Sequence, residues 1–181
     1  MKPKTRQTLL LITGIILTMA LYGGIMILYA MTLIKWWYPV LISLALALFT
    51  WIPLDGIWHR ITRLEKKWAR ILCHMTIMAG FWGFAFLGIN YFCADASSSH
   101  TVYATVTHTY RKEATRIRRV GRRTYVSRRN GWNYYAEVSI PGSGNKELTV
   151  TASQYARLRK GKKMKLNIEK GALGFDILHR Q

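Results

Sequence analysis

The sequence predicts a membrane protein with three transmembrane α-helices followed by a small, mainly β domain of about six strands and one short helix. Three long apolar segments lie before residue 93, and the 88 residues from 94 to 181 contain no apolar run long enough to cross a bilayer. Those 88 residues hold 18 of the 27 Lys and Arg residues, so the charge changes together with the hydropathy. We therefore divide the chain into a transmembrane domain (1–93), a linker (94–100) and a basic β-domain (101–181).

The first expected span covers residues 8–34 and contains no charged residue. Its 27 residues exceed the roughly 20 that cross the hydrocarbon core, so the helix can tilt. Lys2, Lys4 and Arg6 precede it, and a basic start is also typical of a cleavable signal peptide. The apolar part of such a peptide is only about 7–15 residues long. We therefore interpret this segment as an uncleaved anchor.

The second expected span covers residues 36–54, and only Lys35 separates it from the first. Trp36, Trp37 and Tyr38 follow that lysine directly. Aromatic rings of this kind prefer the headgroup level of a bilayer. The sequence therefore predicts a tight helical hairpin that turns at the membrane interface.

The third expected span covers residues 71–93, and a basic segment, 56–70, precedes it. Apolar residues recur at helical spacing within this segment, which predicts an interfacial amphipathic helix or a basic extension of the third span. Trp58 and Trp68 are its expected interface residues.

Two pairs of small residues at i, i+4 spacing are candidate helix-packing positions. They are Ala20/Gly24 in the first span and Ala79/Gly83 in the third. Small residues let transmembrane helices approach closely. The two cysteines, Cys73 and Cys93, lie 20 residues apart in the third span, which is about 30 Å along a helix and too far for a disulfide.

The distribution of positive charge predicts the orientation. Three Lys or Arg residues precede the first span and five lie in 56–70, whereas residues 94–110 contain none. Basic flanks stay in the cytoplasm, so we expect a cytoplasmic N-terminus and a periplasmic or extracellular β-domain. The compact plan with short loops favours a multi-pass protein of the bacterial inner membrane.

Alternating apolar residues and turn signals predict the strands of the β-domain. Asn130-Gly131 lies between two β-rich runs, which predicts a type I′ hairpin because both residues tolerate positive φ. Ser153 is the expected cap of a short helix, 154–160. The other expected elements are a strand over 101–110, a turn over 141–145, a strand over 146–152 and two closing strands between 164 and 179.

Part of the β-domain resembles a family of uncharacterised bacterial modules, small β-domains of unknown function attached to membrane helices. The similarity lies in the Tyr134-Tyr135-x-x-Val138 strand, in Tyr155 before a Lys-Gly turn at Gly161, and in the Gly171–Phe175 segment. It covers about 50 residues. The resemblance implies membrane spans followed by a β-domain and no established activity, and it does not extend to the Arg-rich stretch.

No catalytic or cofactor signature is present in the sequence. We find no nucleophile–base motif, no phosphate-binding glycine loop and no paired carboxylates, so we expect neither an enzyme nor a cofactor. His100, His108 and His179 are too dispersed to predict a metal site. The expected spans contain no Asp, Glu, Lys or Arg, which argues against ion-coupled transport, and we interpret His74 as an interfacial residue.

The strongest functional signal is the segment from Arg111 to Arg129, in which nine of 19 residues are Lys or Arg. Arginine binds phosphate in a bidentate manner and stacks on aromatic rings. A solvated hairpin whose charge prevents edge-to-edge pairing would have the same composition. The candidate anion- or partner-binding residues are Arg116, Arg118, Arg119, Arg122, Arg123, Tyr125, Arg128, Arg129 and Trp132.

These observations favour a non-catalytic accessory or interaction protein. Its basic β-domain would meet an anionic lipid, a glycolipid or an acidic protein outside the cytoplasm. A membrane immunity protein that neutralises a toxin is a second hypothesis. Binding of nucleic acid, for which basic and aromatic residues are also suited, would require the reversed topology.

Overall fold

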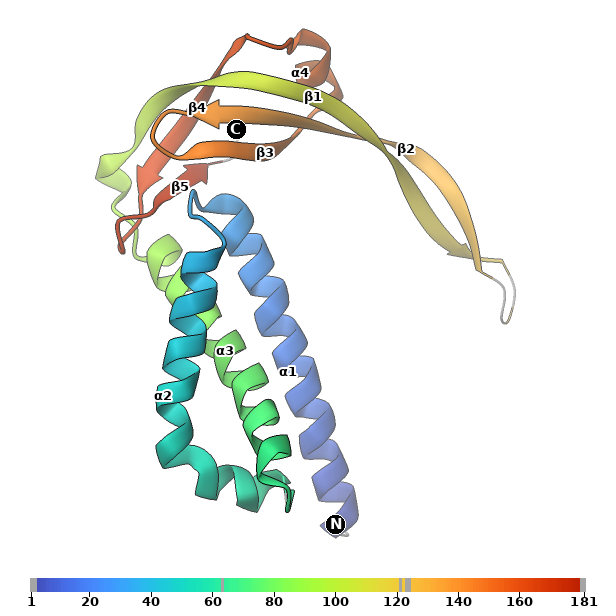
Figure 1. Ribbon diagram of the computed structural model, residues 1–181. Helices are drawn as coiled ribbons and strands as arrows, with labels where there is room; N and C mark the ends of the chain where they lie inside the picture. The colour runs from blue at the N-terminus through green and yellow to red at the C-terminus, as the bar shows by residue number, and fades with distance from the viewer. Residues whose placement is uncertain (1–2, 63, 121, 123–124, 180–181) are drawn as a thin grey trace. The chain divides into compact units, whose positions relative to one another are not determined.

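The computed structural model describes residues 3–62, 64–120, 122 and 125–179. Three long helices come first, and five strands follow (Figure 1). The helices are α1 (Pro3–Met31), α2 (Trp37–Thr62), α3 (Lys67–Phe92) and α4 (Ala152–Arg157), with a 3₁₀-helix, η1 (Ala96–Ser98). The strands are β1 (His100–Arg119), β2 (Tyr125–Ile140), β3 (Gly144–Val150), β4 (Lys163–Lys170) and β5 (Asp176–His179).

The chain forms two compact units. One consists of Met1–Ser99 together with Ile168–Arg180, and the other is His100–Asn167. The units do not follow the order of the chain, because the segment from Ile168 groups with the helices and not with the strands that precede it.

Three helices are long and apolar enough to cross a membrane, over Ile12–Met31, Trp37–Thr62 and Lys67–Phe92. They indicate a multi-pass membrane protein. The segment 56–70 is not one amphipathic helix, because α2 continues to Thr62 and α3 begins at Lys67. Figure 1 shows a change of direction in the C-terminal part of α2, where Pro53 lies inside the helix. Proline lacks an N–H group and crowds the preceding turn, which accounts for the bend.

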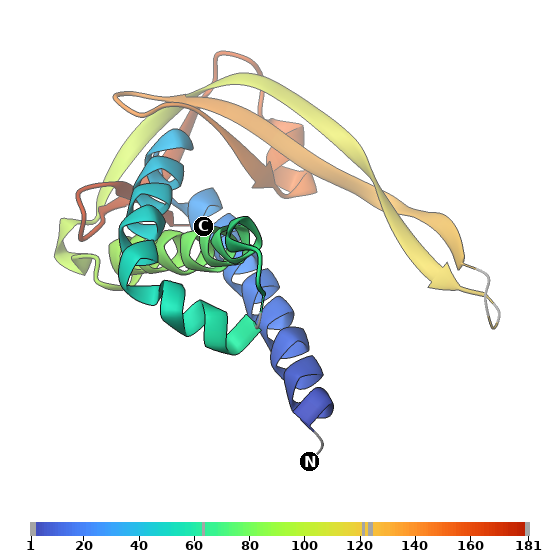
Figure 2. The ribbon, with the colours of Figure 1, turned by 60° about the horizontal axis from the view of Figure 1, so that its bottom comes forward.

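Helix α3 packs against both α1 and α2 (Figure 2). A Cβ at Gly24 would lie 2.5 Å from the Phe84 ring, and one at Gly83 would lie 3.1 Å from Ile25. These two glycines therefore permit close contact between α1 and α3. Gly80, which the sequence analysis did not single out, has the same role against Tyr22.

The strand order in the sheet is β3-β2-β1-β4-β5, and β2 is antiparallel to both β1 and β3. The expected hairpin at Asn130-Gly131 is wrong, since β2 continues through both residues. The register of β1 and β2 shifts there: Glu113 lies opposite Trp132 and Thr115 opposite Arg129. Asn130-Gly131 therefore forms a β-bulge, where the positive φ of Gly131 is used without reversing the chain. One long strand, β2, takes the place of two expected strands, and the described residues form a sheet of five strands.

Apolar side chains that alternate along β1 and β2 form the core of the second unit. Ala104 and Val106 of β1 and Ala136, Val138 and Ile140 of β2 are all buried, as the two-residue period of a strand requires.

Helix α4 packs against β2, with the rings of Tyr134 and Tyr155 4.9 Å apart. It begins earlier than expected because Thr151, and not Ser153, is its cap. Thr151 and Gln154 form a reciprocal capping box.

Candidate functional site

A two-stranded ribbon continues beyond the rest of the sheet. Strand β3 pairs only with Tyr134–Ile140 of β2, and the backbone contacts of β1 near β4 are at Val106. Among the described residues, 111–119 of β1 and 125–133 of β2 pair with each other and lie beyond the part of β2 that pairs with β3. We call these two segments, together with Val120 and Arg122, the arm. It extends far past β3 (Figures 1 and 2).

Aromatic stacking supports the base of the arm. The rings of Tyr110 and Tyr135 stack at 5.2 Å across β1 and β2, and His108 stacks on Tyr110 at 5.9 Å. The Lys112 ammonium group lies 5.1 Å from the Tyr110 ring and 5.0 Å from the Tyr135 ring. These contacts fix the point where the ribbon leaves the sheet.

Two hydrogen bonds raise pKa values where the arm leaves the sheet. The Tyr110 hydroxyl donates to Glu147, which raises the pKa of Tyr110. The hydrogen bond between Lys112 and Tyr110 raises the pKa of Lys112. Both residues therefore keep their protons at neutral pH, and Lys112 carries its positive charge.

Two arginines of the arm are held against one tryptophan. The guanidinium carbons of Arg111 and Arg129 lie 4.3 and 4.4 Å from the centre of the Trp132 ring. Arg129 also forms an ion pair with Glu113 at 3.3 Å. Arg111 comes from β1 and Arg129 from β2, so this cluster links the strands and orders two cations that remain exposed to solvent.

Apolar side chains are exposed in the outer part of the arm. Ile117 is 71% exposed and Tyr125 is 65% exposed, and Val120 and Val126 are exposed as well. Arg116, Arg119 and Arg122 are exposed in the same part of the ribbon. The arm therefore combines cations with exposed apolar and aromatic groups.

The structure brings most predicted binding residues together in the arm. Arg116, Arg119, Arg122, Tyr125, Arg129 and Trp132 all lie there. Arg118 and Arg128 belong to its strands, but their side chains, like all of Arg123, lie outside the described residues. The sequence analysis missed Arg111 as a member, although its place opposite Tyr134 and its contact with Trp132 join it to the cluster.

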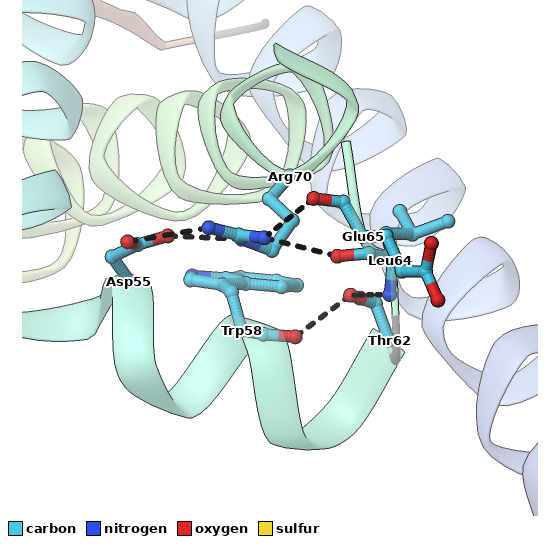
Figure 3. Close-up of polar contacts among 6 residues, drawn as sticks. All are labelled: Asp55, Trp58, Thr62, Leu64, Glu65 and Arg70. Atoms are coloured by element: carbon cyan, nitrogen blue, oxygen red, sulfur yellow. Dashed lines mark hydrogen bonds and ion pairs between the residues drawn. The ribbon is translucent and has the colours of Figure 1, made fainter. Parts of the chain in front are cut away.

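An ion pair that the sequence analysis missed joins α2 to α3 (Figure 3). Nε of Arg70 lies 3.0 Å from Oδ1 of Asp55, and Nη1 donates to the carbonyl oxygens of Leu64 and Glu65. Figure 3 shows the Trp58 indole alongside the guanidinium group. The Arg70 side chain is only 11% exposed, so it fastens the ends of the two helices together.

His74, which the sequence analysis placed at the membrane interface, is fully buried between α2 and α3. Its Nε2 lies 2.8 Å from the carbonyl oxygen of Ala47, which can only accept a hydrogen bond, so Nε2 is the donor. The rings of Trp51 and Trp58 meet the imidazole edge-on. His74 is therefore a packed residue of the helix interface.

The predicted membrane-interface residues lie in different surroundings. Trp36 is exposed in the turn between α1 and α2, and Trp37 and Tyr38 stack in the first turn of α2. Trp68 is exposed at the start of α3, whereas Trp58 packs against His74. Of the predicted packing positions, Ala20 is exposed and Ala79 is half-buried.

The segment from Gly171 to Phe175 is joined to the C-terminal end of α3 by the buried Asn90. Its Nδ2 donates to the carbonyl oxygen of Phe175 at 3.0 Å, and its Oδ1 accepts from the Leu173 amide at 3.1 Å. The Asn90 carbonyl oxygen accepts from Ala172. Phe175 packs against the apolar cluster of Leu28, Ile34 and Leu87.

Further backbone contacts join this segment to the helical part of the chain. The Leu33 amide donates to Asp176, and Thr32 forms a β-bridge with Ile177. The expected linker contains η1, in which Asp95 accepts from Ser97 and the Ser98 hydroxyl accepts from the Lys170 amide. Residues 94–99 are thus tied to the end of β4.

Within the part of the chain that the structure describes, no group of three His, Cys, Asp or Glu side chains is placed to hold a metal ion. Comparison of the chain with protein-family models, curated proteins and solved structures found no match. The resemblance of the segment from Tyr134 to Phe175 to membrane-anchored β-modules therefore stays a prediction.

Proposed function

We propose that this chain is a non-catalytic membrane protein whose arm binds the phosphate groups of anionic lipid outside the cytoplasm. The observation that carries the proposal is the ordered pair of exposed arginines on Trp132, in a ribbon that also exposes apolar side chains. Arginines held in place in this way lose less conformational freedom when they bind phosphate.

The residues of the arm favour lipid over an acidic protein or nucleic acid. Nine Lys and Arg residues against one Glu between positions 111 and 129 attract any polyanion. Exposed Ile117, Val120 and Tyr125 add groups that can enter the boundary between headgroups and acyl chains, where tyrosine is enriched in membrane proteins. Lipid surfaces offer both partners at once, namely phosphate for the arginines and hydrocarbon for the apolar side chains.

The proposed orientation follows from the basic residues near the span ends. The N-terminal flank and the α2–α3 turn are basic, so both are proposed to lie in the cytoplasm. The α1–α2 turn and the β-strands then lie outside. Fusion of alkaline phosphatase to residue 181 tests this: an active fusion supports the proposed orientation, and an inactive but expressed fusion overturns it.

The binding test uses the full chain in nanodiscs of zwitterionic lipid, so that the disc itself offers no anionic surface. Immobilised vesicles with or without phosphatidylglycerol serve as the target, and binding is measured over a salt series. In the test variant, Arg116, Arg119, Arg122 and Arg129 become Gln. Each basic residue near an anionic surface contributes about 1 kcal/mol, so we expect a loss of at least about 100-fold.

A matched control removes the same charge outside the arm, with Arg157, Arg159, Lys160 and Lys163 replaced by Gln. These four residues are exposed around α4 and the start of β4. The proposal requires this control to bind nearly as well as the wild type. Equal losses in both variants, or no loss in the arm variant at low salt, would show that the arm is not a lipid site.

A further inference from the structure

An apolar cavity of about 320 Å³ lies among the three long helices. Tyr29 and Trp36 line it beside the α1–α2 turn, and Tyr22 and Ser43 line it deeper in the bundle. Seven residues separate Tyr29 from Tyr22, which is about 10 Å along a helix. The cavity therefore extends from the turn into the apolar part of the bundle, over most of the depth of one leaflet.

The side chains of the cavity differ between floor and rim. Ala79 and Gly83 of α3 form a floor of small residues, while Met26, Val40 and Leu44 of α1 and α2 are bulky and exposed at the rim. The cavity is thus a slot between α1 and α2 that reaches down to α3.

The shape and lining of the slot favour a narrow apolar occupant. An acyl chain is a single flexible row of methylene groups, whereas a helix with its side chains is about 10–12 Å wide. The residues that line the slot are almost all apolar, so a chain lying along it would meet apolar side chains over its length. One acyl chain therefore fits the slot better than a partner helix.

The α1–α2 turn, beside which the slot begins, carries a charge that suits a lipid headgroup. Lys35 precedes Trp36 directly and is the only charged residue between positions 7 and 54. Its side chain is exposed, and no ion pair of Lys35 occurs among the described residues. A single cation next to an aromatic residue that lines an apolar slot matches a phosphate attached to an acyl chain.

We propose that the slot binds one acyl chain of an anionic phospholipid, with its phosphate on Lys35. The site is separate from the arm. The α1–α2 turn is charged only by Lys35, whereas the arm carries many basic residues, so the two sites can be removed independently. The bound lipid would fill the space between α1 and α2, which contact each other less than either contacts α3.

Native mass spectrometry of the full chain, released from detergent, tests this proposal. The probes are phosphatidylglycerol and phosphatidylcholine with identical palmitoyl and oleoyl chains. We expect one retained lipid per chain, with phosphatidylglycerol preferred at least fivefold. Ala79→Leu fills the slot and should reduce binding of both lipids at least tenfold. Lys35→Gln should abolish the preference and leave the binding of phosphatidylcholine unchanged.

Matched controls separate these effects from general ones. Ala45→Leu adds the same bulk at an exposed position of α2 that does not line the cavity, and Lys67→Gln removes one charge at the opposite end of the bundle. Both should bind like the wild type, and so should the four-arginine variant of the arm. If Ala79→Leu does not fold, Met26→Trp blocks the slot from its exposed rim.

Several results would overturn the proposal. Absence of a retained lipid in the wild type, or equal loss in Ala79→Leu and Ala45→Leu, would exclude the slot as the site. Retention of the preference for phosphatidylglycerol in Lys35→Gln would exclude the headgroup contact. A dimer mass that disappears in Ala79→Leu would mean that a second copy covers this face. Loss of the lipid in the arm variant alone would assign it to the arm.

Discussion

The arm and the segment 168–179 are both β-structure with little apolar core of their own, yet they are held in opposite ways. The arm exposes its apolar side chains and keeps its shape through contacts at the surface, such as the two arginines on Trp132. The segment 168–179 buries Ile168, Ile177 and Leu178, and the buried Asn90 satisfies its backbone groups.

The exposed groups of the arm are available to a binding partner, whereas the buried groups of the segment 168–179 hold the fold together. Cations and apolar groups that face solvent can acquire a partner without breaking a contact of the protein. The Asn90 side chain is fully buried, so breaking one of its hydrogen bonds leaves a polar atom of Asn90 unpaired where water does not reach it. Substitutions in the segment should therefore affect stability, and substitutions in the arm should affect binding.

The largest expected effect comes from Gly171→Ala. The new Cβ would lie 2.4 Å from both terminal atoms of the Asn90 side chain and from the carbonyl oxygen of Phe175. We expect a loss of about 2–3 kcal/mol, which is a fall in Tm of about 5–10 °C, measured by tryptophan fluorescence in detergent. Gly56→Ala, at a helical position with open space around it, is the control and should not lower Tm. Equal Tm values for the two variants would contradict the close packing at Gly171.

Asn90→Ala should have the next largest effect. Two hydrogen bonds are lost, at a cost of about 0.5–1.5 kcal/mol each, while the carbonyl oxygen of Phe175 still accepts from the Gly171 amide. Amide exchange should accelerate over residues 171–178 more than elsewhere. The same substitution in the arm, Asn133→Ala, changes an exposed residue and should leave both exchange and Tm unchanged. Similar effects of the two variants would remove the distinction between the regions.

Trp132→Leu should loosen the arm without affecting the segment. Two contacts with arginine are lost, each worth about 0.5–1 kcal/mol at an exposed site. Amide exchange should accelerate in 111–119 and 125–133, while exchange in 171–178 and Tm should stay within error. Trp68→Leu is the control, because Trp68 is exposed and belongs to neither region. A change of Tm with no change of exchange in the arm would contradict the role assigned to Trp132.

The smallest expected effect is a response to acid at η1. Hydrogen bonds from the side chain and backbone of Ser97 lower the pKa of Asp95 below 3.8. The stabilisation is therefore complete above pH 3.8 and is lost as the pH falls through the lower, folded-state value. Exchange of the Ser97 amide, corrected for its intrinsic rate, should accelerate below that pH. Asp95→Asn should show no such step, and a step of equal size in it would assign the response to another group.

The presence of the three long helices could be predicted from the sequence, but the residues at which they end could not. Long segments without charge require a spanning helix, because no other backbone conformation satisfies its hydrogen bonds in lipid. The end of α2 could not be predicted, since Pro53 and Asp55 both indicate a loop. Asp55 is accommodated because Arg70 neutralises it from 15 residues away, and no local pattern reveals that pairing.

In the candidate site too, features of one short segment could be predicted, whereas contacts between residues far apart in the sequence could not. The basic composition of the arm is local, and it indicated the candidate residues that the structure brings together there. The turn was misplaced because Asn-Gly suits a β-bulge as well as a hairpin, and only the pairing of β1 with β2 distinguishes them. The role of Asn90 depends on a partner 85 residues away, which its neighbours in the sequence do not indicate.

The contacts of residues 171–177 also constrain the order in which the chain can fold. The Leu33 amide and Asn90 lie near the ends of helices that are made early, but their partners follow more than 80 residues later. Contacts of such long range form slowly. During synthesis these groups therefore have no partner until residues 171–177 have been made. A chain interrupted before Gly171 would have helices with an uncovered apolar end, which a protease or chaperone that binds apolar surface could recognise.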